Sequence, residues 1–315
     1  MQRSVQYWRL VKTDGSALDG LFPAERVVRA LRGASSKGFD RHRQCRDGMV
    51  LIAHGLRENP PMLILDKVRH ENLPSIGDGS GTRRAIGLSA DEGLLEPTYC
   101  MFANDNIVAM LMSGNGPRAK RLCDYLKAKL GVEVGLDPIL RRDLDRVLDE
   151  MRVSSVDVAV PAARINRDLV GGDWAEALEA NRVLAQDGVV KVGVAVGRRG
   201  TRDQKDRRRF HIRELIDQLR GSGAISEMQS ARVTGTIRGS QRSVDLFADH
   251  FVERTEVDAD RLANPERSAS YAHSVLEQSL ADNASYLSEV VPRIVGTSND
   301  LNPRFVELPD DERNR

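Results

Sequence analysis

The chain has 315 residues, of which 40% are hydrophobic and 30% are charged, and its net charge is +1. Such a composition excludes an intrinsically disordered chain, and the balanced charge excludes a general attraction of the whole molecule to polyanions. There is no apolar run of about 18 residues and no charged leader before an apolar segment, so we expect a cytoplasmic protein. The three cysteines have neither CxxC nor histidine spacing, which predicts reduced thiols rather than disulfides or a zinc site.

The first part of the chain alternates predicted strands with helices. Apolar patterns predict a strand at 5–11, a helix at 21–31, a hairpin of 49–56 with 62–69, and an edge strand at 83–88. The glycine-rich segment Ser75–Thr82 has the composition of a phosphate-binding loop. No helix is predicted directly after it, and such a loop needs the N–H groups of a helix start, so we do not expect phosphate binding there.

The segment 97–130 is predicted to form the centre of the first domain. Its run Ile107–Met112 has almost no polar interruption, which indicates a strand buried on both faces. The corner Gly114–Pro117 leads into a helix that ends at Gly131. Arg118, Lys120 and Arg121 lie in the first turn of this helix, where cations are disfavoured unless an anion is near. They are second-rank candidates for anion contacts, and a tight corner with solvated arginines is the alternative.

From Ser154 the pattern changes to an order of β-α-β-α-β-β. The predicted strands are 156–161, 189–196, 229–238 and 243–247, and the predicted helices are 174–186 and 210–220. We therefore predict an α/β (α+β) fold with two domains, a mixed-sheet globular domain of residues 1–153 plus 258–315 and a smaller inserted domain of residues 154–257. A last helix at 265–291, roughly 40 Å long, packs either on the first domain or against a second copy of the chain.

The strongest local anomaly is the concentration of positive charge in Gly197–Arg213. Eight cations stand against Asp203 and Asp206, a local charge of +6 in a chain whose total is +1: Arg198, Arg199, Arg202, Lys205, Arg207, Arg208, Arg209 and Arg213. We expect them in a loop between a strand and a helix start, a position that suits phosphate contacts. A solvated loop balanced by acids from elsewhere is the alternative. Aromatic residues are only 4%, which argues against a base-stacking surface.

No catalytic set is predicted from the sequence. The acidic residues are dispersed among arginines and do not form the clustered carboxylates of a metal-dependent nuclease. Cys100 and Cys123 lie in apolar patterns, where a buried and unreactive thiol is expected, and His54 lies on a predicted strand. We therefore predict neither an enzyme nor a cofactor.

The order of segments resembles the RexA family of phage-exclusion proteins. The residues that carry the resemblance are Tyr7–Leu10, Leu21–Phe22, Leu31, Met101–Val108, Gly116–Pro117, Leu122, Asp124–Leu126, the strands after Glu227, and Ser270–Ala272. The resemblance implies a homodimer whose globular domain is made from both ends of the chain, with an inserted mobile domain that can swivel. It also implies sequence-nonspecific binding of double-stranded DNA, no catalysis, and a membrane-protein partner that acts after a phage is sensed.

We therefore expect a DNA-binding homodimer that senses phage infection in a prophage-encoded exclusion system. No family motif transfers to the DNA contacts, so the arginines named above are assigned from their charge alone. The alternative class is a nuclease or toxin-like hydrolase that acts on nucleic acid. A third class is a structural dimer that recruits another protein.

Overall fold

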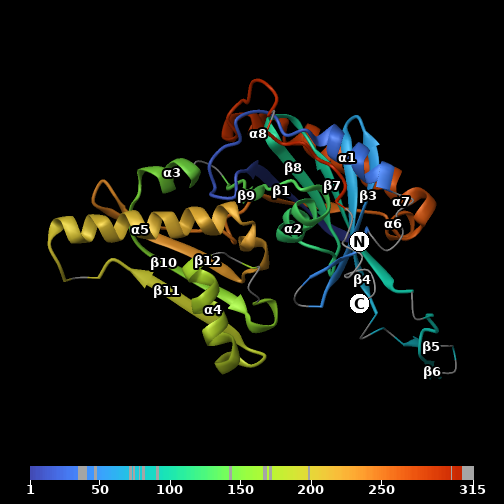
Figure 1. Ribbon diagram of the computed structural model, residues 1–315, viewed down its shortest axis with the longest axis horizontal. Coiled ribbons are helices and arrows are strands. Elements are labelled where there is room, and N and C mark those ends of the chain that lie inside the picture. The colour runs from blue at the N-terminus through green and yellow to red at the C-terminus, as the bar shows by residue number, and fades with distance from the viewer. Residues whose placement is uncertain are drawn as a thin grey trace.

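The computed structural model describes all residues except 35–40, 46–47, 71–72, 74, 78, 80–81, 90–91, 142–143, 166–168, 170–171, 198, 299 and 307–315. The described chain forms an eight-stranded sheet and a four-stranded sheet that lie side by side (Figure 1). Helices cover faces of both sheets, and a short hairpin of β5 (Ile76–Gly77) and β6 (Arg83–Arg84) projects from the larger unit. The α+β class predicted from the sequence is confirmed.

The large sheet has the order β14-β1-β8-β7-β4-β3-β2, with β9 also paired to β1. Its strands are β1 (Gln2–Val11), β2 (Arg43–Gln44), β3 (Val50–Glu58), β4 (Pro61–Arg69), β7 (Leu94–Phe102), β8 (Ile107–Met112), β9 (Gly135–Pro138) and β14 (Val252–Glu256). Every pairing between these strands is antiparallel, where a mixed sheet was expected. Antiparallel neighbours need only short connections, and two residues join β3 to β4.

Strand β8 lies in the interior of the large sheet, as its apolar sequence predicts. All six of its residues are buried, and it pairs with β1 on one side and β7 on the other. Alternate side chains of β1 point to opposite faces of the sheet, and both faces are covered by hydrophobic clusters. Val5 and Tyr7 pack into one hydrophobic cluster, whereas Trp8 and Leu10 pack into the cluster on the opposite face.

Helices α1 (Ala24–Gly33) and α2 (Ala119–Leu130) cover one face of the large sheet. Helices α7 (Pro265–Asp282) and α8 (Ala284–Val290) cover the other, and the short α6 (Ala259–Ala263) precedes them. Gly131 ends α2 in the left-handed conformation, with φ +64°, as predicted. The single long last helix that we expected is instead interrupted at Asn283.

The apolar side of the last helices packs on the protein's own large sheet. Ala272, Leu276 and Leu287 are buried in the same cluster as Tyr7 and Met101. Of the two alternatives left open by the sequence, packing on the first domain is therefore the one observed. These side chains are not available to a second copy of the chain.

The small sheet has the order β11-β10-β12-β13 and is antiparallel throughout. Its elements follow the predicted order: β10 (Arg152–Pro161), α4 (Gly172–Ala185), β11 (Val189–Ala195), α5 (Arg202–Gly221), β12 (Ser230–Ile237) and β13 (Ser240–Asp245). Trp174 of α4 and Leu215 of α5 share one core with the strands, and the Trp174 indole N–H donates to the Leu215 carbonyl. In Figure 1, α5 runs along the whole sheet, and its first turns lie farthest from the large sheet.

The chain passes between the two sheets through a narrow neck. Outgoing Leu140 bridges returning His250, and Arg141 N–H donates to the Asp249 carbonyl. The core of the small unit extends from Leu140 to Leu246 and includes residues of α3 (Leu144–Glu150). Relative to the expected boundaries at 153/154 and 257/258, α3 therefore belongs with the small sheet and β14 with the large one.

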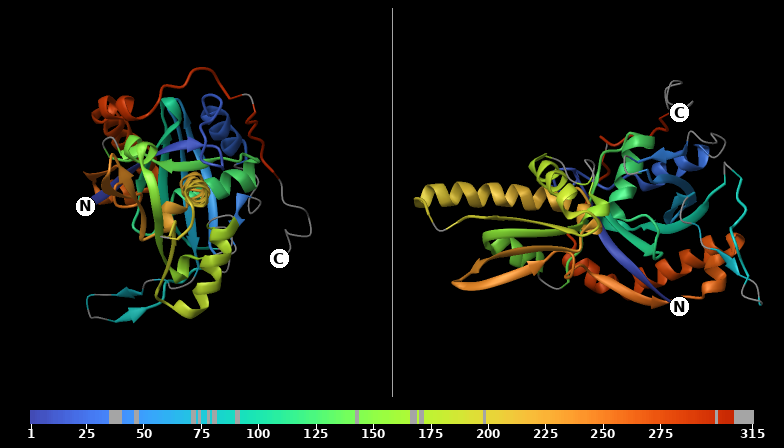
Figure 2. Two further views of the ribbon diagram at one scale, coloured as in Figure 1. Left: turned by 90° about the vertical axis from the view of Figure 1, so that its left-hand side faces the viewer. Right: turned by 90° about the horizontal axis from the view of Figure 1, so that it is seen from below.

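The C-terminal end of α5 is anchored to the large sheet at this neck (Figure 2). The Arg220 guanidinium donates to both oxygens of Asp137, each at 2.8 Å, and to Asp145 at 2.6 Å. Arg9 of β1 also bonds Asp137, at 2.5 Å. A methyl group on Gly221 would lie only 2.4 Å from the Gly15 nitrogen, so the backbones are in direct contact. The start of α5 projects outward from a firmly packed base.

Candidate nucleic-acid interface

Helix α5 begins at Arg202, eight residues before the start predicted at Phe210. Thr201 is its N-cap. The Thr201 hydroxyl accepts from Gln204 N–H, and the Gln204 side chain accepts from Thr201 N–H, which makes a capping box. The sequence Thr-Arg-Asp-Gln contains this signal, but charged residues in the first turns hide the apolar periodicity. Most of the predicted cations therefore lie on a helix rather than in a loop.

Three of the predicted cations are held by neighbouring groups. Arg208 donates to the carbonyls of Val196 and Arg199, at 3.0 and 2.9 Å, and so holds the loop before the helix. Arg213 bonds the Leu148 carbonyl and Asp149, at 2.6 and 2.7 Å, and so holds α3.

Arg209 completes this set by forming a 2.5 Å ion pair with Asp206. Asp206 also lies 3.4 Å from Arg152. The hydrogen bond from Arg209 is the main cause of a lowered pKa of Asp206, and the hydrogen bond from Arg152 lowers it further. Arg208, Arg209 and Arg213 thus have structural partners, and their charge is partly balanced within the small unit.

The remaining cations of the segment are available at the surface. The Arg202 side chain is 89% exposed, and its one acidic neighbour among the described residues is Asp206 at 4.0 Å. Arg199, Lys205 and Arg207 form no ion pair with a described residue, and Arg199 and Arg207 are exposed. Arg198 lies outside the described residues. The accessible part of the predicted site is therefore smaller than the sequence indicates.

The second-rank candidates Arg118, Lys120 and Arg121 are used inside the protein. Arg118 donates to the Ser226 carbonyl at 2.7 Å, and Lys120 pairs with Asp124. Arg121 has a side chain only 4% exposed and lies 3.6 Å from Glu227. The start of α2 packs here against the short helix Ala224–Glu227, so the charges at this corner join two parts of the fold.

The structure places three further arginines, Arg146, Arg238 and Arg242, close to the predicted cations. Strand register places the start of β10, the end of β11 and the β12–β13 hairpin at the same end of the small sheet. A cavity of about 610 Å³ lies there, between α3 and the hairpin. Its described lining includes Arg146, Arg238 and Arg242, with Glu150 as the one acidic side chain. Neither Arg238 nor Arg242 forms an ion pair with a described residue.

We call this end of the small sheet the cationic end. Its accessible basic residues come from four elements or loops, and they are Arg152, Arg199, Arg202, Lys205, Arg207, Arg238 and Arg242. No local sequence pattern connects the hairpin arginines with α5, because about 30 residues separate them. The sequence indicated a turn at Gly239–Ser240 between the two predicted strands, and the pairing of β12 with β13 places this turn beside α3.

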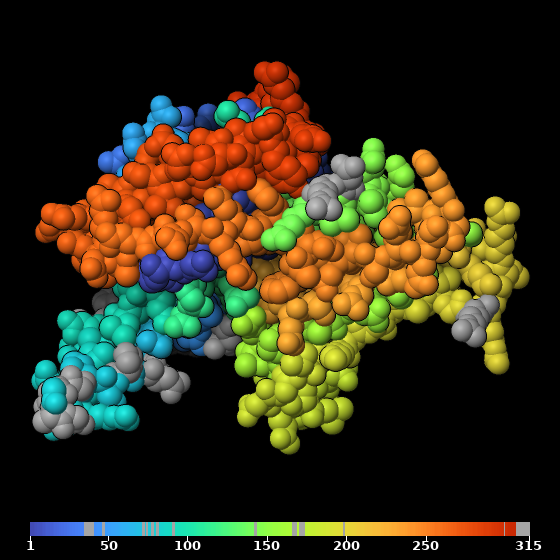
Figure 3. Space-filling view, turned by 180° about the vertical axis from the view of Figure 1, so that it is seen from behind, coloured from blue at the N-terminus to red at the C-terminus, as the bar shows by residue number. Residues whose placement is uncertain are grey.

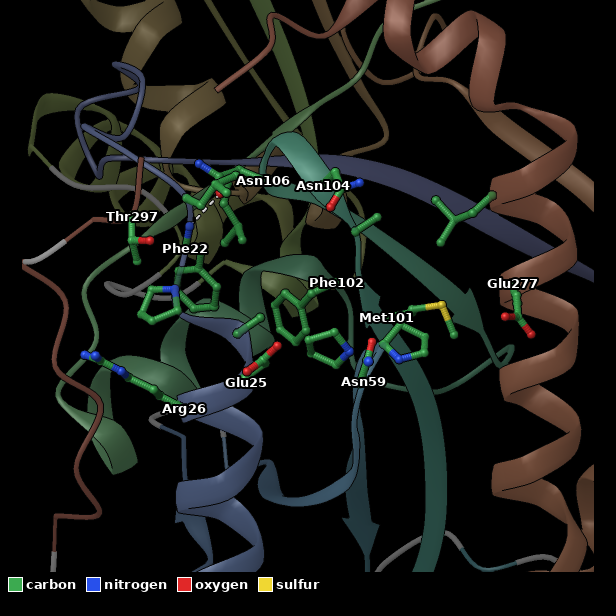
Figure 4. A pocket seen from close by; sticks show the side chains of 18 residues that line it. Phe22, Glu25, Arg26, Asn59, Met101, Phe102, Asn104, Asn106, Glu277 and Thr297 are labelled. Carbon is green, nitrogen blue, oxygen red and sulfur yellow. Dashed lines mark hydrogen bonds between the residues drawn. The ribbon is translucent and has the colours of Figure 1, made fainter. Parts of the chain in front are cut away.

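A second cavity of about 610 Å³ lies in the large unit, beside the start of α1 (Figure 4). Phe22 and Phe102 stack there at 5.5 Å between ring centroids. Asn106 holds the adjoining loop, because its side chain accepts from Phe22 N–H and donates to the Gly20 carbonyl. The labelled polar side chains around this cavity carry both signs of charge, so it does not resemble a phosphate site.

The residues that the sequence offered for metal or nucleophilic chemistry, the acids, the cysteines and His54, do not form a metal or nucleophile site in the described part of the chain. No group of three or more His, Cys, Asp or Glu residues there is arranged to hold a metal ion. The three cysteines are buried and form no disulfide, and burial raises the pKa of the Cys100 thiol and raises that of Cys123 to about 12. His54 is half-buried beside Arg41, and burial lowers its pKa to about 4.

Comparisons of the whole chain with known proteins found no similar protein. No family model, curated protein or solved structure matches the chain. None of the described helices is both long and apolar enough to cross a membrane.

Proposed function

We propose that the protein binds double-stranded DNA without sequence preference, through the cationic end of the small sheet. The observation that carries the proposal is the convergence there of cations that form few ion pairs with described residues. Arg202, Lys205 and Arg207 project from the first turns of α5, and Arg238 and Arg242 lie in the neighbouring cavity. Arginine and lysine at this density are suited to phosphate oxygens, which carry no sequence information.

The electrostatics of the whole protein fit such a local site. A chain of net charge +1 has no general affinity for polyanions, so attraction depends on this one end. Each phosphate contact releases condensed counterions, and the affinity then falls steeply with salt concentration. The anchored base of α5 keeps these cations in a fixed arrangement, because Arg220 and Asp137 hold the helix to the large sheet.

The biological role that we propose rests on the resemblance to phage-exclusion proteins. In this role DNA binding is the sensing step of an antiphage system, and the protein signals to a membrane-protein effector without catalysing a reaction. The homodimer of this proposal uses a surface other than the apolar side of α7, which the large sheet already covers. Swivelling of the small unit would require the Arg220–Asp137 contact to break.

A salt titration of DNA binding tests the proposal. The triple variant R202A/K205A/R207A and the double variant R238A/R242A should each bind a duplex more weakly. The slope of log affinity against log salt should fall by roughly 0.9 for each phosphate that the variant no longer neutralises, or roughly 2.7 for the triple variant. The matched control R29A/K127A/R267A removes three exposed cations from the large unit and should leave the slope unchanged.

The same assay separates the alternative classes. If the triple and double variants bind with the affinity and salt slope of the wild type, the cationic end is not the site. Cleavage of plasmid or RNA that is abolished by a chelator would replace the proposal by a nuclease. A protein that neither retards nor cleaves nucleic acid would belong to the structural class.

A further inference from the structure

A cavity of about 520 Å³ lies on the face of the large sheet where α6 meets α7. In Figure 3, the dark blue N-terminal strand, the orange segment before α7 and the teal strands of the large sheet meet on this face. Its apolar walls include Ile64, Leu95, Pro97, Tyr99, Leu111 and Leu262. A cavity of this size with apolar walls and a few polar groups is typical of small-molecule sites.

The cavity contains a carboxylate without a partner among the described residues. Asp66 of β4 is only 4% exposed, and it forms no hydrogen bond or ion pair with any of them. Its cross-strand neighbours are Ile52 and Pro97, and neither side chain can donate a hydrogen bond to it. Burial raises the pKa of Asp66 to about 6. An isolated buried carboxylate is costly, and its place in a cavity marks it as a candidate for ligand binding.

Two further polar groups in the same cavity are also unsatisfied. The Arg3 Nε and the Ser113 hydroxyl are buried and have no hydrogen-bond partner in the described part of the chain. Asp66 of β4 pairs with Pro97 of β7, and Met112, the last residue of β8, pairs with Thr98 and with Ser4 of β1. Continuing this register by one residue puts Ser113 level with Pro97 and Arg3, so Arg3, Ser113, Pro97 and Asp66 form one row across the sheet. At about 4.8 Å between neighbouring strands, the backbones of Arg3 and Asp66 are roughly 14 Å apart. The row thus has a cation at one end, a hydroxyl between, and an anion at the other end.

We infer that this cavity binds a small zwitterion with an apolar body, of the size of an amino acid or a dipeptide. Asp66 accepts from the ligand ammonium, Arg3 donates to the ligand carboxylate, and the apolar walls contact the side chains. Asp66 and Arg3 are too far apart to neutralise each other directly, so a ligand that carries both charges satisfies both. An extended dipeptide spans about 7 Å, which leaves room within the row for the two protein side chains.

This arrangement excludes simpler occupants. A divalent metal ion needs several oxygen ligands, and Asp66 is the only carboxylate among the described residues that line the cavity. An apolar molecule without charge would leave the Asp66 and Arg3 groups unsatisfied. The site is separate from the cationic end, because its polar residues lie on β1, just after β8, and on β4 of the large sheet. The inference therefore does not depend on DNA binding.

Binding can be tested with leucine and leucyl-leucine on the full chain. We expect calorimetric heat and a raised Tm with at least one of the two, whereas leucinamide and N-acetylleucine, which each lack one charge, bind at least tenfold more weakly. D66N and R3M should each weaken binding of the zwitterion by about 10- to 100-fold, the effect of losing one charge-assisted hydrogen bond. D260N, on α6 but outside the cavity lining, should bind as the wild type does.

Three results would overturn the inference. The first is no binding of either zwitterion at about 10 mM by calorimetry, a concentration that would detect even a weak complex. The second is equal binding of leucinamide or N-acetylleucine, which would remove the two-ended recognition. The third is unchanged affinity in both D66N and R3M, with circular dichroism showing that both variants are folded.

Discussion

Replacing Asp66 by asparagine should stabilise the protein at neutral pH. Burial raises the pKa of Asp66 to about 6, whereas an aspartate in an unfolded chain has a pKa of about 3.9. The difference of about 2 units corresponds to about 3 kcal/mol. Between about pH 4 and pH 6 the folded state binds more protons at this group than the unfolded state. The free energy of unfolding contributed by Asp66 therefore falls as the pH rises through this window.

Urea unfolding of the wild type and of D66N at two pH values measures this effect. Asparagine resembles the protonated acid, so D66N should be more stable by about 3 kcal/mol at about pH 7.5 and nearly equal to the wild type at about pH 4. D260N is the control, because Asp260 is exposed on α6. A difference that does not change with pH, or no difference at about pH 7.5, would refute an uncompensated charge at Asp66. Stabilisation on removal of a charged group is typical of functional sites.

The other predictions concern α5 and its anchor. T201A removes the hydroxyl of the capping box and should cost about 1 kcal/mol, measured by thermal unfolding, whereas T201S should retain most of the stability. R220A leaves buried Asp137 with Arg9 alone and should cost about 3 kcal/mol or more by urea unfolding. Burial lowers the pKa of His250 to about 4. The wild type should therefore lose stability as the pH falls below about 6.5, and H250N should not show this loss.

The decrease of the free energy of unfolding at acid pH also depends on Asp137. Burial by itself would raise the pKa of Asp137, but the charges and hydrogen bonds of Arg220 and Arg9 outweigh it and lower the pKa. Its contribution is present above about pH 4 and is lost as the pH falls through the lower folded value. R220A should therefore make this decrease smaller. Equal acid sensitivity of R220A and the wild type would contradict the pairing, and equal Tm values for T201A and T201S would contradict the cap.

Local patterns were sufficient for several elements. The uninterrupted apolar run Ile107–Met112 indicated a strand covered on both faces, and all its residues are buried. Gly131 indicated the end of α2, because glycine adopts the left-handed conformation without a steric cost. The β-α-β-α-β-β order of the small unit followed from the same kind of reading. Each of these features depends on residues close together in the chain.

The candidate sites depend on contacts between residues far apart in the chain. A count of charges identified the arginines of Gly197–Arg213, but it did not show that Arg208, Arg209 and Arg213 have structural partners. Nor did it bring Arg238 and Arg242 to the same end of the sheet, which is a result of strand register.

The row from Arg3 to Asp66 has the same origin, since four strands from distant parts of the chain must pair before the two charges share a cavity. Hydrophobic periodicity follows from backbone geometry and can be read locally. Which charged groups are neutralised is settled only when the folded chain brings their partners within a few ångströms, because electrostatic and hydrogen-bond energies depend on those distances.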